Sequence, residues 1–189
     1  CIIGYKQLER ALDEMKDAVD ATLVWHPFEL APDTPAEGQP LADYARERYG
    51  ATPEQSGKNR DRIKAAGTTL GIDFRYGDNS RIYNTHKAHQ LLKWAEATDR
   101  QTALNLALFT AYFTDQRNVA EDDVLLEAVD SARLDRDEAR QVLEDGRHAG
   151  DVRAEEAYWH DHNITGVPAY IVDGKYMIPG AQDAETFRK

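Results

Sequence analysis

The middle of the chain, residues 41 to 150, is one long run of helical sequence between two flanks of a different kind. Apolar residues recur there at the three- and four-residue spacing of amphipathic helices. Asn84 is a residue type that caps helix N-termini, so we expect a helix to begin directly after it. The pattern predicts helices over Leu41–Tyr49, Gln55–Leu70, Thr85–Thr98, Thr102–Phe113, Glu121–Ala132 and Leu134–Gly146. Any fold for this chain must therefore accommodate a large helical block.

The N-terminal flank predicts a helix and then a strand. Apolar residues between Ile2 and Ala18 recur at helical spacing, so a helix is expected to begin directly at Cys1; they are Ile3, Leu8, Leu12 and Met15, with Val19 just beyond. Residues Ala21 to Leu30 are rich in β-branched and aromatic types and predict a strand, with Pro27 marking a kink or an edge. A proline-rich loop follows before the helical block begins.

The C-terminal flank predicts a helix, a hairpin and a final helix. Gly150 to Asn163 continues the helical pattern, and the sequence then changes to two short β-type runs. These runs, Ala169–Val172 and Lys175–Ile178, are joined by Asp173-Gly174, a strong signal for a two-residue hairpin turn. Asp183 is placed to cap the last helix. The predicted order is helix, strand, helical block, helix, hairpin, helix.

Charge and cysteine content narrow the classes of function. The formal net charge is −11 over 189 residues, and such an acidic chain repels nucleic acid and anionic membranes. Apolar runs such as Asn105–Phe109 fall far short of the roughly 20 residues that a membrane span requires. Cys1 is the single cysteine, which excludes an internal disulfide or a zinc site built from cysteines.

Several segments, in this order and spacing, resemble one known family. The segments are Cys1-Ile2-Ile3-Gly4 with Leu8-Glu9, Trp25-His26-Pro27-Phe28-Glu29-Leu30, Asn84-Thr85 through Ala88-His89 to Trp94-Ala95, Ala111-Tyr112-Phe113, Gly166-Val167-Pro168-Ala169 and Gly180-Ala181-Gln182. The chain resembles DsbA-family thioredoxin-like oxidoreductases of the FrnE-like branch. That branch is related to 2-hydroxychromene-2-carboxylate isomerases and kappa-class glutathione transferases.

The resemblance implies an α/β fold: a thioredoxin fold with a large all-helical insertion between the second strand and the following helix. Residues 1–35 and 150–189 would form the thioredoxin-like domain, and residues 40–148 the insertion. A first strand and a further cysteine, three residues before Cys1, are expected upstream. Cys1 would then be the second cysteine of a CxxC motif and a catalytic residue. The related isomerases and transferases commonly carry serine at this position.

The same resemblance assigns a second element of the site. Val167-Pro168 corresponds to the cis-proline that faces the dithiol, and the backbone of Val167 would bind substrate. Disulfide exchange needs one attacking thiolate and one resolving thiol. A helix N-terminus favours a thiolate through its free N–H groups and its dipole, and Cys1 is predicted to lie at such a position.

Other polar residues have a functional and a structural interpretation. Glu29 is a candidate proton acceptor for the resolving thiol, because a buried carboxylate can have a raised pKa; the alternative is a strand-end carboxylate in water or bonded to backbone. The histidine pairs, His86 with His89 and His160-Asp161-His162, suggest a metal only weakly against capping or surface roles. Asn84 is a helix cap, or a lining residue of a glutathione cleft. Trp94, Tyr112 and Phe113 are most simply core aromatic residues. The acidic run Glu121-Asp122-Asp123 is most simply the solvated start of a helix.

Three functions remain open at this stage. The first is a thiol–disulfide oxidoreductase acting on protein or small-molecule thiols and disulfides, with no bound cofactor and no metal. The second is a glutathione-dependent isomerase or transferase, with glutathione as co-substrate. The third is a redox-inactive thioredoxin-like binding module. We expect no nucleic-acid or membrane partner, a bacterial cytoplasmic location, and a homodimer as the candidate assembly.

Overall fold

The structure, a computed structural model, describes all 189 residues, which form two compact units. Unit 1 comprises Cys1–Leu23 and Ala157–Lys189, and unit 2 comprises Val24–Glu156. The second boundary falls inside one helix, α8 (Ala149–Asp161). None of the helices has the length and apolar character needed to cross a membrane.

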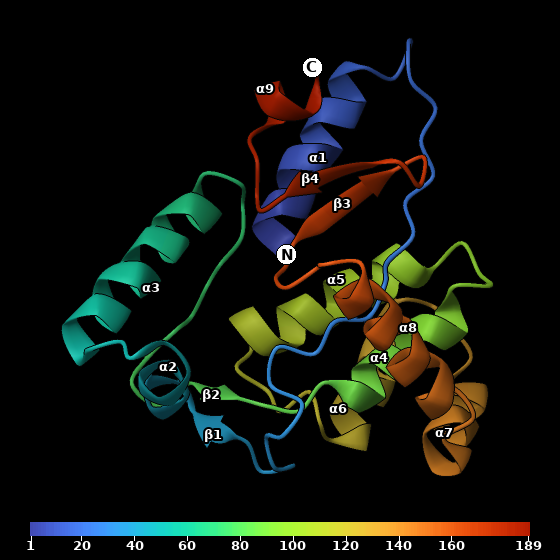
Figure 1. Cartoon of the computed structure of the whole chain (residues 1–189). Coiled ribbons are helices and arrows are strands. Elements are labelled where there is room, and N and C mark those ends of the chain that lie inside the picture. The colour runs from blue at the N-terminus through green and yellow to red at the C-terminus, as the bar shows by residue number, and fades with distance from the viewer. The chain divides into compact units, whose positions relative to one another are not determined.

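Unit 1 contains α1 (Ile2–Glu14), the antiparallel strands β3 (Ala169–Val172) and β4 (Tyr176–Pro179), and α9 (Ala184–Phe187) (Figure 1). Asp173 and Gly174 both have positive φ, and the N–H of Lys175 donates to the carbonyl of Val172, so a tight turn forms where it was predicted. Val172 pairs with Tyr176, so the connection has three residues rather than two, and β4 begins at Tyr176 rather than Lys175. Asp183 caps α9 by accepting a hydrogen bond from the N–H of Thr186.

Helix α1 differs from its predicted extent and from its predicted face. It ends at Glu14 rather than Ala18, because the N–H of Met15 is shared between two carbonyls and a turn follows. Its most buried residues are Ile2, Gly4 and Ala11, whereas the larger apolar side chains of the predicted stripe are half-buried or exposed. Two of the three buried residues are small, as close packing on the helix surface requires.

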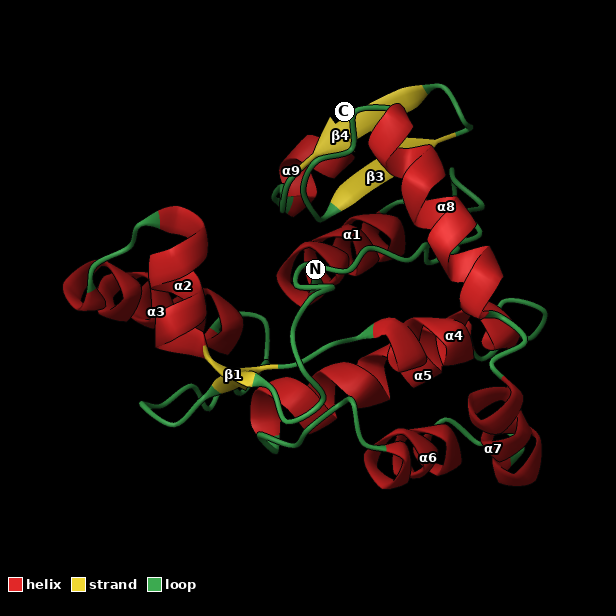
Figure 2. Ribbon diagram, turned by 60° about the horizontal axis from the view of Figure 1, so that its bottom comes forward, coloured by secondary structure: helices red, strands yellow, loops and turns green.

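Unit 2 is built around a four-helix core. Helices α4 (His86–Ala95), α5 (Gln101–Phe109), α6 (Asp122–Ser131) and α7 (Arg136–Asp145) pack together around the fully buried Leu91, Leu104, Leu125, Val129 and Val142 (Figure 2). Helix α5 continues into a π-helical turn, η1 (Thr110–Thr114), where the N–H of Asp115 donates to the carbonyl of Thr110. Helices α2 (Leu41–Tyr49) and α3 (Pro53–Thr68) precede this core.

The helical block is not purely helical. Two-residue strands β1 (Gln39–Pro40) and β2 (Arg81–Ile82) pair with each other as a separate antiparallel ladder, and β2 lies inside the predicted block. Neither strand joins β3 or β4. Strand β2 lies in the long connection between α3 and α4. A strand of two residues is too short to be predicted from an alternating sequence pattern.

The predicted strand Ala21–Leu30 is wrong, because this segment has no strand partner. Its backbone is instead bonded by side chains from helices. The N–H of Trp25 donates to Gln101 Oε1, and Gln101 Nε2 donates to the carbonyl of Trp25. The N–H of Glu29 donates to Glu156 Oε1 at 2.8 Å. These bonds assign the segment from Val24 onward to unit 2.

The contact boundaries therefore differ from the expected domains of 1–35 plus 150–189 and 40–148. They lie at residues 23 and 156, since residues 24–35 and the first half of α8 pack with the helical core. The order of helices, hairpin and final helix agrees with the sequence prediction.

Candidate active site

Cys1 is the N-cap residue of α1, and its thiol is free and exposed. The carbonyl of Cys1 accepts the first helical hydrogen bond, from the N–H of Tyr5 at 2.9 Å. The first turn of α1 contains no acidic residue, so no carboxylate in that turn reduces the positive potential that the helix N-terminus offers to a thiolate. The position suits a sulfur that must carry negative charge.

The Val167–Pro168 peptide bond is cis, as the family resemblance implies. The carbonyl of Pro168 accepts a hydrogen bond from the N–H of Gly180 at 2.8 Å, which fixes the proline at the start of the β3–β4 ladder. No backbone hydrogen bond occupies the N–H or the carbonyl of Val167. Val167 thus offers backbone groups next to an ordered ladder.

Gly4 joins the two elements within unit 1. A Cβ atom at this position would lie 3.2 Å from Pro168 Cγ, 3.3 Å from Ala181 Cα and 2.1 Å from Tyr170 Oη. The first turn of α1 therefore packs directly on the cis-proline loop. Cys1 precedes Gly4 by three residues, so both lie on the same side of the helix start.

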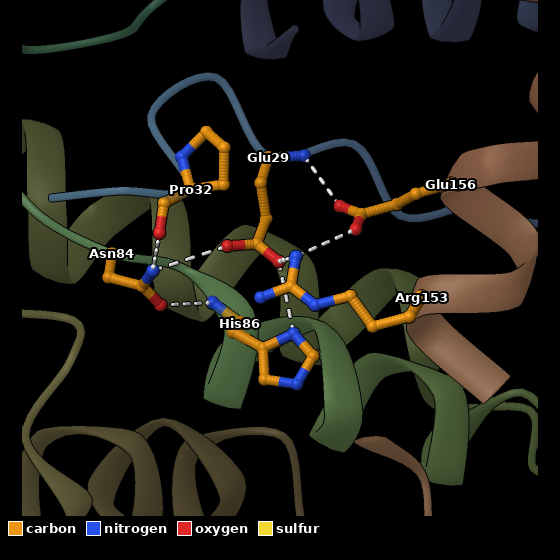
Figure 3. Close-up of polar contacts among 6 residues, drawn as sticks. All are labelled: Glu29, Pro32, Asn84, His86, Arg153 and Glu156. Carbon is orange, nitrogen blue, oxygen red and sulfur yellow. Dashed lines mark hydrogen bonds and ion pairs between the residues drawn. The ribbon is translucent and has the colours of Figure 1, made fainter. Parts of the chain in front are cut away.

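Glu29 lies at the centre of a buried polar cluster in unit 2 (Figure 3). Its side chain is only 2% exposed and accepts hydrogen bonds from Arg153 Nη1 at 2.6 Å and Asn84 Nδ2 at 3.3 Å, with His86 Nδ1 at 3.0 Å. Arg153 also bonds Glu156 Oε2, at 3.2 Å. The cluster ties the 24–30 segment to α4 and α8.

Burial and the nearby Glu156 carboxylate raise the pKa of Glu29, while Arg153 and His86 act in the opposite direction. Burial lowers the pKa of the neighbouring His89 to about 4, so this imidazole is neutral at pH 7. The oxygens of Glu29 are taken up by donors of its own unit. Its role as proton acceptor for a thiol stays a prediction.

A second ionic contact holds the same segment. Glu155 pairs with His26 and with Lys93, whose Nζ lies 3.0 Å from Glu155 Oε2. Burial would raise the pKa of Glu155, but these two partners outweigh it and hold the pKa below its usual value. Sequence reasoning missed α8 as the partner of the segment. The signal was Glu29 itself, an acid among apolar residues that predicts a basic partner when it is buried.

The remaining candidate residues serve structural contacts. Asn84 stands one residue before the N-cap Thr85, where its Oδ1 accepts from the N–H of His86 and its Nδ2 also bonds the carbonyl of Pro32. His162 Nδ1 bonds the carbonyl of Tyr158. The structure holds no group of three or more His, Cys, Asp or Glu side chains arranged for a metal. The other residues behave as expected: Trp94 and Tyr112 pack against apolar clusters, and Glu121-Asp122-Asp123 begins α6.

Comparison with known proteins decides the family. A family model described as a DSBA-like thioredoxin domain matches residues 1–189. The chain belongs to this family. The match confirms the DsbA-like thioredoxin fold and the oxidoreductase-type family expected from the sequence.

Two individual proteins are similar to this DsbA-like chain. The crystal structure of the "probable DsbA oxidoreductase SCO1869" from Streptomyces coelicolor superposes with a TM-score of 0.89 at 33% identity, covering 100% of this chain and 81% of that one. The "Uncharacterized protein YwbO" of Bacillus subtilis (strain 168) is 25% identical over 191 residues, covering 100% of this chain and 88% of that protein.

Proposed function

We propose that this DsbA-like chain is a thiol–disulfide oxidoreductase of the FrnE-like branch, and that Cys1 is the resolving cysteine of a CxxC motif. The observation that carries the proposal is the packing around Gly4, which brings the helix turn begun by Cys1 against the cis-proline loop. The related protein described as a probable DsbA oxidoreductase supports the same chemistry.

The proposed reaction runs in two exchanges. The thiolate three residues upstream attacks one sulfur of a substrate disulfide, forms a mixed disulfide and releases one substrate thiolate. The Cys1 thiolate then attacks the upstream sulfur, forms the enzyme disulfide and releases the second substrate thiolate. The substrate disulfide is reduced and the enzyme dithiol is oxidised; the reverse sequence oxidises a substrate dithiol.

Val167 is the proposed substrate-positioning residue. Its unoccupied backbone groups suit an extended substrate chain that pairs in the manner of an added strand. The substrates are protein or small-molecule thiols and disulfides, and the reaction needs no bound cofactor. We propose a cytoplasmic location, as the resemblance to FrnE-like proteins implies, and the single cysteine in these 189 residues agrees with a reducing compartment.

The test is a trapping experiment on the full-length protein. Cys1→Ala removes the resolving thiol, so the mixed disulfide with a disulfide-containing peptide should accumulate and be visible by intact-protein mass spectrometry. Replacing the upstream cysteine by alanine is the matched control and should give no adduct. Absence of an adduct with Cys1→Ala, together with unchanged turnover, would show that Cys1 is not a redox residue.

A further inference from the structure

A pocket of about 380 Å³ lies in unit 2, beside the loop between α3 and α4 and the π-helical turn η1. Its wall includes two guanidinium groups, from Arg75 and Arg81, and two phenol rings, from Tyr83 and Tyr112. The volume falls at the lower end of the range of about 300–1,000 Å³ typical of small-molecule sites. The lining also includes Asp78, whose fully exposed carboxylate lies 3.8 Å from Arg60 Nη2. The wall therefore combines two guanidinium groups, one ion-paired carboxylate and aromatic surface.

Arg81 is the unusual residue of this wall. Its Nη2 donates to the carbonyl of Gly38 at 2.7 Å and its Nε to the carbonyl of Glu37 at 3.1 Å, and its guanidinium forms no ion pair with a carboxylate. The chain carries 34 acidic and 23 lysine and arginine residues, so acids are plentiful. A guanidinium held in place by two neutral carbonyls keeps its full charge for an added anion.

The aromatic part of the wall is rigid. Tyr83 packs on Gly38, where a Cβ would lie 2.4 Å from the tyrosine ring. Tyr112 donates its hydroxyl to the carbonyl of Arg81 at 2.8 Å and packs edge-to-face on Tyr83, with ring centroids 6.1 Å apart. Fixed side chains lose little conformational freedom when a ligand binds.

Two unusual backbone features meet at the same pocket. Tyr112 belongs to the π-helical turn, and Gln116, just after it, has a positive φ of 55°. Gln116 Oε1 accepts a hydrogen bond from the hydroxyl of Ser80 at 2.7 Å, which connects the turn to the opposite loop. Single π-helical turns and positive-φ residues other than glycine are concentrated at functional sites.

We propose that this pocket binds a small organic anion. Its carboxylate or phosphate group would pair with Arg81, assisted by Arg75, and its planar body would pack on Tyr83 and Tyr112. The site is independent of Cys1 and of disulfide exchange.

Isothermal titration of the full-length protein tests the proposal, with phenyl phosphate and benzoate as probes at constant ionic strength. One of the two should bind saturably at one site, with a dissociation constant on the order of 1 mM or tighter. The tighter probe identifies the anionic group. Benzylamine, a cation of the same size, should not bind, and inorganic phosphate should bind at least about tenfold more weakly than phenyl phosphate.

Variants locate the binding. Arg81→Gln should weaken binding about tenfold or more, because the paired guanidinium is lost. Arg75 is exposed and paired only with exposed Asp73, so Arg75→Gln should weaken binding less and leave the melting temperature unchanged. Arg48→Gln is the matched control, since it removes the same charge from an exposed helix residue outside the pocket.

Each outcome decides the matter. Binding that is weakened about tenfold or more in Arg81→Gln and less in Arg75→Gln, with retention in the control, supports the site. Failure of both anions to bind, or equal weakening in Arg48→Gln and Arg81→Gln, overturns it. Equal affinity for inorganic phosphate and phenyl phosphate overturns the role given to the tyrosine wall.

Discussion

The segment Val24–Leu30 and the β3–β4 hairpin have the same kind of sequence, rich in β-branched and aromatic residues, but different bonds hold them. The hairpin is held by a backbone ladder that pairs Ala169 with Pro179 and continues to the turn. The Val24–Leu30 segment is held by side chains of α4, α5 and α8, several of them charged. Ladder bonds between amides do not titrate, whereas carboxylate and imidazole contacts do. The two regions should therefore respond differently to mutation and to pH.

The largest effect is expected at Glu29. Glu29→Ala leaves Arg153 and His86 without their buried acidic partner and should lower the free energy of unfolding by about 2–3 kcal/mol. This is less than the roughly 3–5 kcal/mol typical of fully buried pairs, because the Arg153 side chain is half-exposed. Urea unfolding followed by circular dichroism measures the change. Glu54→Gln, which breaks an exposed ion pair with Lys58, is the control and should change stability by less than about 0.5 kcal/mol. Equal losses of unfolding free energy in the two variants would show that the buried polar cluster around Glu29 does not stabilise the fold more than an exposed ion pair does.

A pH effect of intermediate size is expected from His89. Its pKa is about 4 in the folded chain against 6.5 unfolded, so unfolding takes up a proton between these values. The stability due to neutral His89 is fully present above pH 6.5 and falls as the pH drops towards 4, by on the order of 2 kcal/mol. Urea midpoints from pH 7 to pH 4.5 should show this slope.

His89→Gln removes the titrating group, so the slope should flatten whatever the variant's stability at pH 7. His162→Gln, at an exposed histidine, should keep the wild-type slope. A slope that persists in His89→Gln would assign the acid sensitivity to other groups.

The smallest effect is expected in the hairpin turn. Gly174 has a φ of 65°, which costs a residue with a Cβ about 1 kcal/mol or more, so Gly174→Ala should speed hydrogen exchange of the β3–β4 amides about fivefold. The effect should be the same at pH 5 and pH 7 after correction for intrinsic exchange. Gly166→Ala, with open space and no positive φ, should leave the exchange unchanged. A pH-dependent loss in Gly174→Ala would remove the contrast between the two regions.

Local patterns predicted most of the helices, the hairpin and the Asp183 cap, whereas Asn84 lies one residue before the N-cap Thr85. Periodicity, Asp183 and the Asp173-Gly174 pair act within a few residues, where sequence is most informative. The strand over Ala21–Leu30 failed because a strand needs a partner, and β-type residues describe only the side-chain preference of the segment.

The candidate site divides in the same way. Cys1 and Pro168 were named from the family resemblance, and the structure connects their elements through Gly4. The partners of Glu29 could not be named, because Arg153 lies 124 residues away along the chain. Such a pairing depends on the packing of α8, and no local pattern encodes it.

The π-helical turn at Thr110–Thr114 makes the aromatic wall of the pocket sensitive to one-residue insertions and deletions in related chains. A π turn closes its hydrogen bond one residue later than an α turn, so it is equivalent to a one-residue insertion in α5. In a homologue lacking that residue, the helix would continue as α, and everything after it would rotate by about 100° around the axis. Tyr112 would leave its place opposite Tyr83. The insertion or deletion of one codon should therefore create or remove the aromatic wall formed by Tyr83 and Tyr112.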